Sequence, residues 1–215
     1  MRLKLIREEA TLDPALNLER DAAYWREWEG NLARVWRNDR CVVLGRFLKA
    51  EEEVYLDRAE DLGVPVLKRA SGGGAVYHDP GNLNYSLYLD LGGLAPGGIA
   101  ESLRRLSFPV TALLSGLGIP WEWVPPNNVF VEGRKISGSA QARSRGRLLH
   151  HGTLLVSCDL ETMRTLLKPG GRSRHAPVIN LCEVLPGMEV EKAAALLAEG
   201  LLRFRDEGGG KRPSP

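Results

Sequence analysis

Three consecutive glycines, Gly72–Gly74, separate segments whose composition is typical of β-strands. Val64–Arg69 precedes them, Ala75–Tyr77 follows directly, and Leu83–Leu89 then alternates apolar and polar side chains. Glycine loses more backbone entropy on folding than any other residue, so a triplet between strands lowers stability. That cost indicates that the backbone passes close to a ligand. We expect a loop of free N–H groups that cradles a phosphate beside a sheet.

The residues around this loop supply cations without completing a nucleotide motif of the doubly wound folds. Lys68, Arg69 and His78 lie within a few residues of the glycines and can offer donors to an anion. The loop lacks the Lys-[Ser/Thr] ending of a Walker loop. It does not fit Gly-x-Gly-x-x-Gly either, because Tyr77 occupies the last glycine position.

Strand-like segments outnumber helical ones along the chain. Asn128–Val131 and Lys135–Ser137 are joined by Glu-Gly-Arg, which predicts a hairpin. Helices are predicted from Asp13 to Gly30, over Glu51–Leu62, from Asp159 to Leu167 and over Glu191–Arg205. A further helix is predicted over Ile99–Leu117, disturbed by Pro109. This pattern predicts an α+β fold with a mainly antiparallel or mixed central sheet flanked by helices.

Composition limits the classes of partner. A chain of 215 residues with 43% hydrophobic and 26% charged residues is typical of one globular domain. A net charge of +2 gives no reason to expect a nucleic-acid partner, and no apolar run is long enough to span a membrane. Three cysteines without zinc spacing predict a reduced, cytoplasmic setting.

Several segments together resemble one family. Arg69, Ser71–Asp79, Gly81, Asn82 and Asn84–Ser86 match the Arg-x-Ser-Gly-Gly-Gly-Ala-Val-Tyr-His-Asp-x-Gly-Asn-x-Asn-Tyr-Ser signature of lipoate–protein ligases. Gly133–Gln141, His150–Leu155 and Asn180–Gly187 resemble further segments of the same ligases. The resemblance runs from about residue 10 to 205, so it covers nearly the whole chain.

The resemblance implies a fold like that of class II aminoacyl-tRNA synthetases and biotin synthetases. Residues 1–207 would form a catalytic domain of the biotin/lipoate protein ligase (BPL/LPL) type and 208–215 a flexible tail, with no accessory C-terminal domain. The implied activity uses ATP and Mg²⁺ to convert lipoate or octanoate to acyl-AMP. The acyl group then passes to a lysine of a lipoyl carrier domain of 2-oxoacid dehydrogenases or of glycine cleavage H protein. A separate accessory subunit is compatible with this activity.

The resemblance also implies roles for single residues. Lys135 would stabilise the charge that develops in both reaction steps, acting as an electrostatic catalyst and not as a nucleophile. No metal ligand is assigned, because Asn127-Asn128 stands where ligases often carry Asn-Asp. The residues implied to bind the nucleotide or acyl group are Arg69, Ser71, Gly72, Gly73, Gly74, Ala75, Val76, Tyr77, His78, Asn82, Asn128, Ser137, Gly138, Ser139, Ala140, His151, Gly152 and Thr153.

Two alternatives remain open. Cys182 could serve as the nucleophile of an octanoyl or lipoyl transferase with the same fold, although a buried, inert thiol is the preferred interpretation. The chain could also be a non-catalytic relative that only binds the ligand. Biotin ligation is disfavoured because no Gly-Arg-Gly-Arg-x-Gly-Arg loop is present. The segment Lys168–Ala176, with Pro169-Gly170-Gly171, is expected to close over bound acyl-adenylate.

Overall fold

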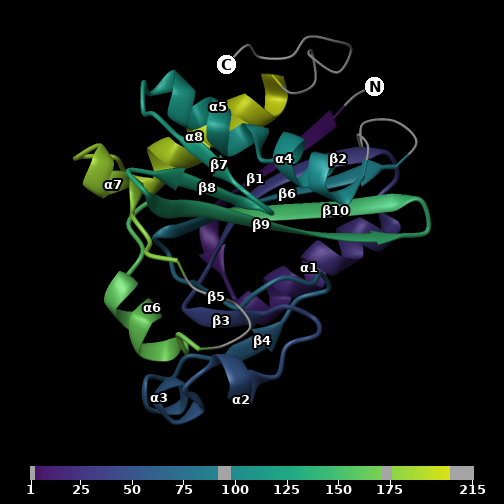
Figure 1. The fold of residues 1–215 in the computed structure, drawn as a ribbon. Helices are drawn as coiled ribbons and strands as arrows, with labels where there is room; N and C mark the ends of the chain where they lie inside the picture. Colours follow the sequence, from purple (N-terminus) through teal and green to yellow (C-terminus); the bar gives the residue numbers. More distant parts are fainter. Residues whose placement is uncertain (1–2, 92–97, 171–175, 204–215) are drawn as a thin grey trace.

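The computed structural model describes residues 3–91, 98–170 and 176–203, and it contains a seven-stranded sheet in the order β1-β2-β6-β10-β9-β8-β7 (Figure 1). Its strands are β1 Leu3–Leu12, β2 Asn31–Asn38, β6 Asn82–Asp90, β7 Glu122–Val124, β8 Asn128–Val131, β9 Arg134–Ser144 and β10 Arg147–Leu155. β1 pairs with β2 in parallel, and the other neighbouring strands pair antiparallel. The predicted α+β class with a mixed, mainly antiparallel sheet is therefore confirmed.

A second, three-stranded sheet has the order β4-β3-β5. Its strands are β3 Cys41–Leu44, β4 Val66–Lys68 and β5 Val76–His78. The glycine triplet lies in the connection between β4 and β5, as the sequence predicted. Tyr77, Val42 and Leu166 share a buried cluster that joins this sheet to the helices on its outer side. Those helices are α2 Ala50–Glu53, α3 Leu56–Asp61 and α6 Leu160–Leu166.

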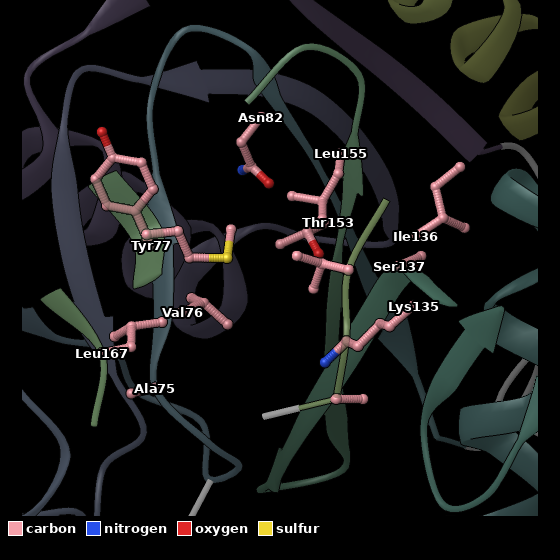
Figure 2. A pocket seen from close by; sticks show the side chains of 13 residues that line it. Ala75, Val76, Tyr77, Asn82, Lys135, Ile136, Ser137, Thr153, Leu155 and Leu167 are labelled. Carbon is pink, nitrogen blue, oxygen red and sulfur yellow. The ribbon is translucent and has the colours of Figure 1, made fainter. Parts of the chain in front are cut away.

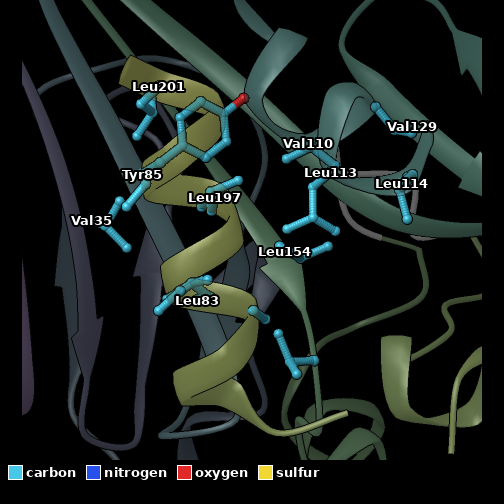
Figure 3. Close-up of a cluster of buried hydrophobic side chains, with 14 of the residues drawn as sticks. Val35, Leu83, Tyr85, Val110, Leu113, Leu114, Val129, Leu154, Leu197 and Leu201 are labelled. Atoms are coloured by element: carbon cyan, nitrogen blue, oxygen red, sulfur yellow. The ribbon is translucent and has the colours of Figure 1, made fainter. Parts of the chain in front are cut away.

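The two faces of the large sheet are covered differently (Figures 1 and 3). Leu83, Tyr85 and Leu87 of β6 point into the main core, beneath α5 Phe108–Gly116 and α8 Val190–Arg203. Tyr88 belongs to a smaller cluster on the opposite face, against α1 Pro14–Glu27. This alternation follows from the two-residue period of a strand. The α1 face is the one that meets the small sheet.

Two predicted helices are each divided in the structure. Ile99–Leu117 is α4 Ile99–Leu106 followed by α5, because Pro109 begins a new helix at its first turn, where its missing N–H breaks no bond. Glu51–Leu62 is α2 followed by α3, because the fully buried Val54 between them is extended and forms a β-bridge with Leu167. The expected disturbance at Pro109 is confirmed, and the prediction of one continuous helix over Glu51–Leu62 was wrong. The remaining helix, α7, is Leu181–Val184.

Other local predictions are confirmed. The Asp13 side chain accepts a hydrogen bond from the Leu16 N–H at 2.9 Å and caps α1. Glu132 and Gly133 have φ values of 50° and 70° and connect β8 to β9 in a tight hairpin. Part of the expected lid, 171–175, and the expected tail, 208–215, lie outside the described residues. Within the described part, no helix is both long and apolar enough to cross a membrane.

Candidate active site

A pocket of about 460 Å³, measured out to its open mouth, lies between the two sheets (Figure 2). Its walls come from the β5, β6, β9 and β10 strands, from α6, and from Ala176 and Val178 at the end of the predicted lid and just after it. The lining residues are Ala75, Val76, Tyr77, Asn82, Lys135, Ile136, Ser137, Thr153, Leu155, Met163, Leu167, Ala176 and Val178. Seven of these were predicted as site residues from the sequence: Ala75, Val76, Tyr77, Asn82, Lys135, Ser137 and Thr153. Motifs up to eighty residues apart therefore meet at one pocket.

Lys135 projects its ammonium into this pocket (Figure 2). Its backbone is fixed on both sides, because its N–H donates to the Pro177 carbonyl at 2.8 Å and its carbonyl accepts from the Ile179 N–H at 3.0 Å. The side chain lies over Gly138, where an added Cβ would stand 2.7 Å from Nζ. Burial, together with the smaller effect of the nearby Arg69 charge, lowers the pKa of Lys135 to about 8.

Arg69 closes the glycine loop on itself. Its Nε donates to the Ser71 hydroxyl at 3.0 Å, and its Nη1 donates to the Val43 carbonyl at 3.2 Å. Its Nη2 donates to the carbonyls of Gly72 and Gly74 at 2.7 and 2.8 Å. Burial lowers the pKa of Arg69 to about 10, so the guanidinium stays charged at neutral pH. Arg69 was expected to bind a phosphate. In the structure it organises the loop whose N–H groups would bind that phosphate.

Glycine is required at two positions where backbones approach each other. Gly73 has a φ of 90°, a left-handed conformation that favours glycine. An added Cβ at Gly45 would stand 2.0 Å from the Gly73 carbonyl oxygen, so no side chain fits there. Gly45 supports the loop and was not among the predicted site residues, although its place directly after the buried strand β3 was a usable signal. On the other side, a Cβ on Gly73 would be 3.4 Å from Ala140 Cβ, which places the loop against β9.

His151 links the glycine loop to α1. Its Nε2 lies 2.5 Å from Ser71 Oγ, and its Nδ1 lies 2.9 Å from Asp21 Oδ2. Asp21 also accepts hydrogen bonds from the hydroxyls of Ser86 and Tyr88, each at 2.6 Å. Burial raises the pKa of Asp21, but the hydrogen bonds from His151, Ser86 and Tyr88 outweigh it, and the pKa lies below its usual value.

Sequence reasoning missed Asp21. The signal that could have found it is its spacing of four residues from Asn17, since both polar side chains lie on the same, buried face of the predicted helix. His150 and His151 face opposite sides of the sheet, as neighbouring residues of one strand do. His150 contacts Tyr85 at 3.2 Å and Gln141 at 3.0 Å on the main-core face.

His78 does not line the pocket. Its Nδ1 lies 3.1 Å from Asn38 Nδ2, and its Nε2 is buried with no hydrogen-bond partner among the described residues. Burial is the main reason why the pKa values of His78 and His150 fall to about 3, so both rings are neutral at pH 7. A ligand-lining role for His78 stays a prediction.

The remaining predicted residues surround Lys135 along the β8, β9 and β10 strands. Asn128 pairs with Gly138, and its Oδ1 would be 3.4 Å from a Cβ added there, on the same side as the Lys135 ammonium. Ser139 is buried and pairs with Gly152. A Cβ on Gly152 would stand 2.6 Å from the ring of Tyr85, so glycine lets that ring pack against the strand.

Neither a metal cluster nor a cysteine is found at the described pocket. In the described chain, no three His, Cys, Asp or Glu side chains are grouped so that they could hold a metal ion. Cys182 lies half-buried on α7 and is absent from the lining given above. Cys41 and Cys158 are buried, and burial raises the pKa of the Cys41 thiol to about 12. The arrangement thus offers fixed cations and donors, and it places no thiol against the pocket.

A mixed sheet that holds a lysine near a glycine loop organised by an arginine suits chemistry on an acyl group and a phosphate. The chain belongs to the lipoyl protein ligase A/B catalytic domain family, whose model matches residues 13–202. Lipoate-protein ligase LplJ of Bacillus subtilis is 31% identical over 207 residues, which are 91% of this chain and 61% of LplJ. The chain therefore spans less than two thirds of the length of that relative.

Two solved structures are similar over almost all of the chain. One describes a bi-partite lipoate protein ligase and its E2 lipoyl domain from Thermoplasma acidophilum, with a TM-score of 0.81 and 28% identity over 95% of this chain and 83% of that chain. The other is a lipoate-protein ligase A bound with ATP, with a TM-score of 0.80 and 29% identity over 95% of this chain and 85% of that chain. The predicted family and fold class are confirmed.

Proposed function

We propose that this chain is the catalytic domain of a lipoate–protein ligase. It activates lipoate or octanoate with ATP to an acyl-adenylate and transfers the acyl group to a lysine of a lipoyl carrier domain. The observation that carries the proposal is the Lys135 ammonium over Gly138, in the pocket walled by the strand that leaves the glycine loop. The similarity to a lipoate ligase bound with ATP supports the same reading.

In the first step, a carboxylate oxygen of the acyl substrate attacks the α-phosphorus of ATP, and the bond to pyrophosphate breaks. Negative charge gathers on the α-phosphate, where preorganised donors contribute most. Lys135 supplies one fixed cation, and the N–H groups of the glycine loop, shaped by Arg69, supply further donors. With a pKa of about 8, Lys135 is mostly protonated at pH 7.

In the second step, the amine of the carrier lysine attacks the acyl carbon, and AMP leaves with the electron pair of the anhydride bond. Lys135 stabilises the oxyanion of this tetrahedral state and donates no electron pair. The small residues Gly138 and Ser139 leave room for the acyl group beside the strand. The proposed nucleotide and acyl-binding residues are those named from the sequence, and Gly45 is added as a support of the loop.

The pocket wall also suits an adenine base. Asn82 lines the pocket, and its Oδ1 is buried without a hydrogen-bond partner among the described residues. A buried acceptor without a donor costs about 1–3 kcal/mol, and the 6-amino group of adenine is a donor of suitable size. Ala75–Tyr77, directly after the glycine loop, form the adjoining wall. These residues therefore support ATP as the nucleotide.

Mg²⁺ would reach this site as part of its complex with ATP. The amides of Asn82 and Asn128 are weak magnesium ligands, and the described pocket lining contains no carboxylate. The described pocket residues thus do not form a magnesium site of their own. The nucleotide phosphates would hold the ion, and no step above depends on a protein-bound metal.

The proposed partners are lipoyl carrier domains of 2-oxoacid dehydrogenases or glycine cleavage H protein, in the cytoplasm. The bi-partite ligase and its E2 lipoyl domain described from T. acidophilum support a carrier domain and make a separate accessory subunit a reasonable further partner. We place the catalytic unit in residues 1–207.

Lipoate-dependent exchange of pyrophosphate into ATP tests the proposal. Exchange that requires both lipoate and the chain supports adenylation. If exchange is absent but transfer from purified lipoyl-adenylate occurs, adenylation needs a partner or is not catalysed. Neither reaction, in a folded protein with tight ligand binding, would show a non-catalytic relative. An acyl thioester trapped on Cys182 would assign the chain to the transferases.

A further inference from the structure

Buried side chains connect helix α1 to the glycine loop in one continuous hydrogen-bonded chain. Asp21 contacts His151 at 2.9 Å, His151 contacts Ser71 at 2.5 Å, and Ser71 accepts from Arg69 at 3.0 Å. Arg69 in turn holds the Gly72 carbonyl at 2.7 Å. Asp21, His151 and Ser71 are 3%, 8% and 0% exposed, so water competes little for these bonds.

The bonding capacities of the groups, together with the shorter of two contacts at Ser71, give this row of hydrogen bonds a direction. The hydroxyls of Ser86 and Tyr88 donate to the Asp21 carboxylate, which can only accept. His151 Nδ1 therefore carries the proton that binds Asp21. The Arg69 Nε–H can only donate, so the Ser71 oxygen accepts from it. The Ser71 proton has two acceptors within reach, the Gly72 carbonyl at 3.3 Å and His151 Nε2 at 2.5 Å, and we assign it to the shorter contact with His151. Every donor then points from the glycine loop toward α1.

We propose that Asp21 is a positioning residue for acyl-adenylate formation, acting through His151 and Ser71 to hold Arg69 and the glycine loop in their reactive arrangement. The inference rests on the ligase function proposed above and assigns to α1 a role beyond packing. Asp21 is not among the residues that line the pocket. It fixes the Nδ1–H form of His151, and that form makes Nε2 the acceptor that orients the Ser71 hydroxyl.

A structural role alone is a weak account of this carboxylate. Taking an ionised carboxyl group out of water is costly, and an apolar side chain at the same place on α1 would pack against the sheet without that cost. Asp21 accepts from Ser86, Tyr88 and His151, and no arginine or lysine of the described residues lies within ion-pair distance of it, while its charge favours the protonated state of Arg69. The Asp21 carboxylate thus has an effect that an apolar side chain would lack, because its charge stabilises the Arg69 guanidinium of the glycine loop.

Asp21→Asn removes the charge with little change of volume and is the main test. We expect kcat for lipoate-dependent ATP–pyrophosphate exchange to fall roughly tenfold to hundredfold with a small change in KM, because a displaced loop loses transition-state contacts first. Asp21→Glu keeps the carboxylate and should recover part of the loss. Glu19→Gln, an exposed charge removal on the same helix, is the matched control and should leave kcat unchanged.

A double-mutant cycle separates positioning from general destabilisation. If Asp21 acts through Ser71, Asp21→Asn adds less than about twofold in a Ser71→Ala background, since the coupled path is already broken. If the two losses multiply, the proposal is overturned. Equal kcat for Asp21→Asn and wild type would also overturn it.

The ring nitrogens of His151 give a readout that does not require ligase activity. Long-range ¹H–¹⁵N spectra of the wild-type chain should show a protonated Nδ1 and an unprotonated Nε2, and Asp21→Asn should shift this toward the Nε2–H form. An Nε2–H form in the wild type would overturn the proposal. Failure of the ligase assay in wild type, with the expected ring spectrum, would instead count against the proposed function. If Asp21→Asn does not fold, the wild-type spectrum and Asp21→Glu still decide.

Discussion

Gly138→Ala should lower activity with little change in stability, because the end of the Lys135 side chain lies against Gly138. The added Cβ would stand 2.7 Å from Lys135 Nζ, 2.8 Å from Lys135 Cε and 3.4 Å from Asn128 Oδ1. Gly138 does not have a positive φ, so alanine meets no backbone strain there. The two closest atoms belong to the far end of a flexible side chain, which can move away.

The size of the effect follows from that movement. Lys135 Nζ must withdraw from 2.7 Å to at least the 3.4 Å at which ordinary contact begins. A displacement on the order of 1 Å in a catalytic group can cost about a hundredfold in rate, so we expect kcat for adenylate formation to fall roughly tenfold to hundredfold. Stability should change by less than about 1 kcal/mol, since alanine also restricts the unfolded chain.

Steady-state pyrophosphate exchange and urea unfolding, measured on the same preparations, check both halves of the prediction. Gly116→Ala is the control, because nothing lies within 4 Å of a Cβ at Gly116, and it should leave kcat unchanged. In a Lys135→Ala background, Gly138→Ala should have no further effect on rate. Wild-type kcat in Gly138→Ala, or a loss of several kcal/mol of stability, would refute the reasoning.

Further outcomes are expected from single substitutions and from the pH dependence of the rate. Lys135→Ala should lower the rate of acyl transfer about a hundredfold or more in a folded protein. In the wild type, a pH–rate profile should show kcat/KM falling as pH rises through about 8, because Lys135 loses its proton there. Cys182→Ser should keep most activity, and acyl-enzyme detected by mass spectrometry would argue otherwise. Gly152→Ala should destabilise the fold by about 1–3 kcal/mol in urea titrations, because its Cβ would meet the Tyr85 ring at 2.6 Å. Asn82→Ala should reduce the preference for ATP over inosine triphosphate about tenfold, measured as a ratio of kcat/KM values; an unchanged ratio would remove Asn82 from base recognition.

The fold was predictable where local chemistry decides the backbone. Asp13 before Pro14 specified the start of α1, and Glu132-Gly133 specified the hairpin between β8 and β9. The helix predicted over Glu51–Leu62 failed because Val54 bridges to Leu167, a pairing that spans more than a hundred residues. A local pattern carries no information about such a partner.

The residues of the candidate site also fall into those that could be predicted from the sequence and those that could not. Arg69, the glycine loop and Lys135 were found because each stands in an uninterrupted motif. Asp21 and Gly45 were missed because their importance lies in distant contacts, with His151 and with the Gly73 carbonyl. The exclusion of His78 from the pocket lining likewise depends on how β5 packs, since its neighbours Val76 and Tyr77 do line it.

The most direct test of the central claim is an intact-mass measurement after the chain is mixed with an acceptor lipoyl domain and purified lipoyl-adenylate. Supplying the adenylate removes any requirement for a partner in activation, so only the proposed transfer chemistry is measured. The account predicts one lipoyl group in amide linkage on the carrier lysine, none on the chain itself, and loss of the product in Lys135→Ala. A carrier that stays unmodified, or an acyl group held on Cys182 of the chain, would contradict it.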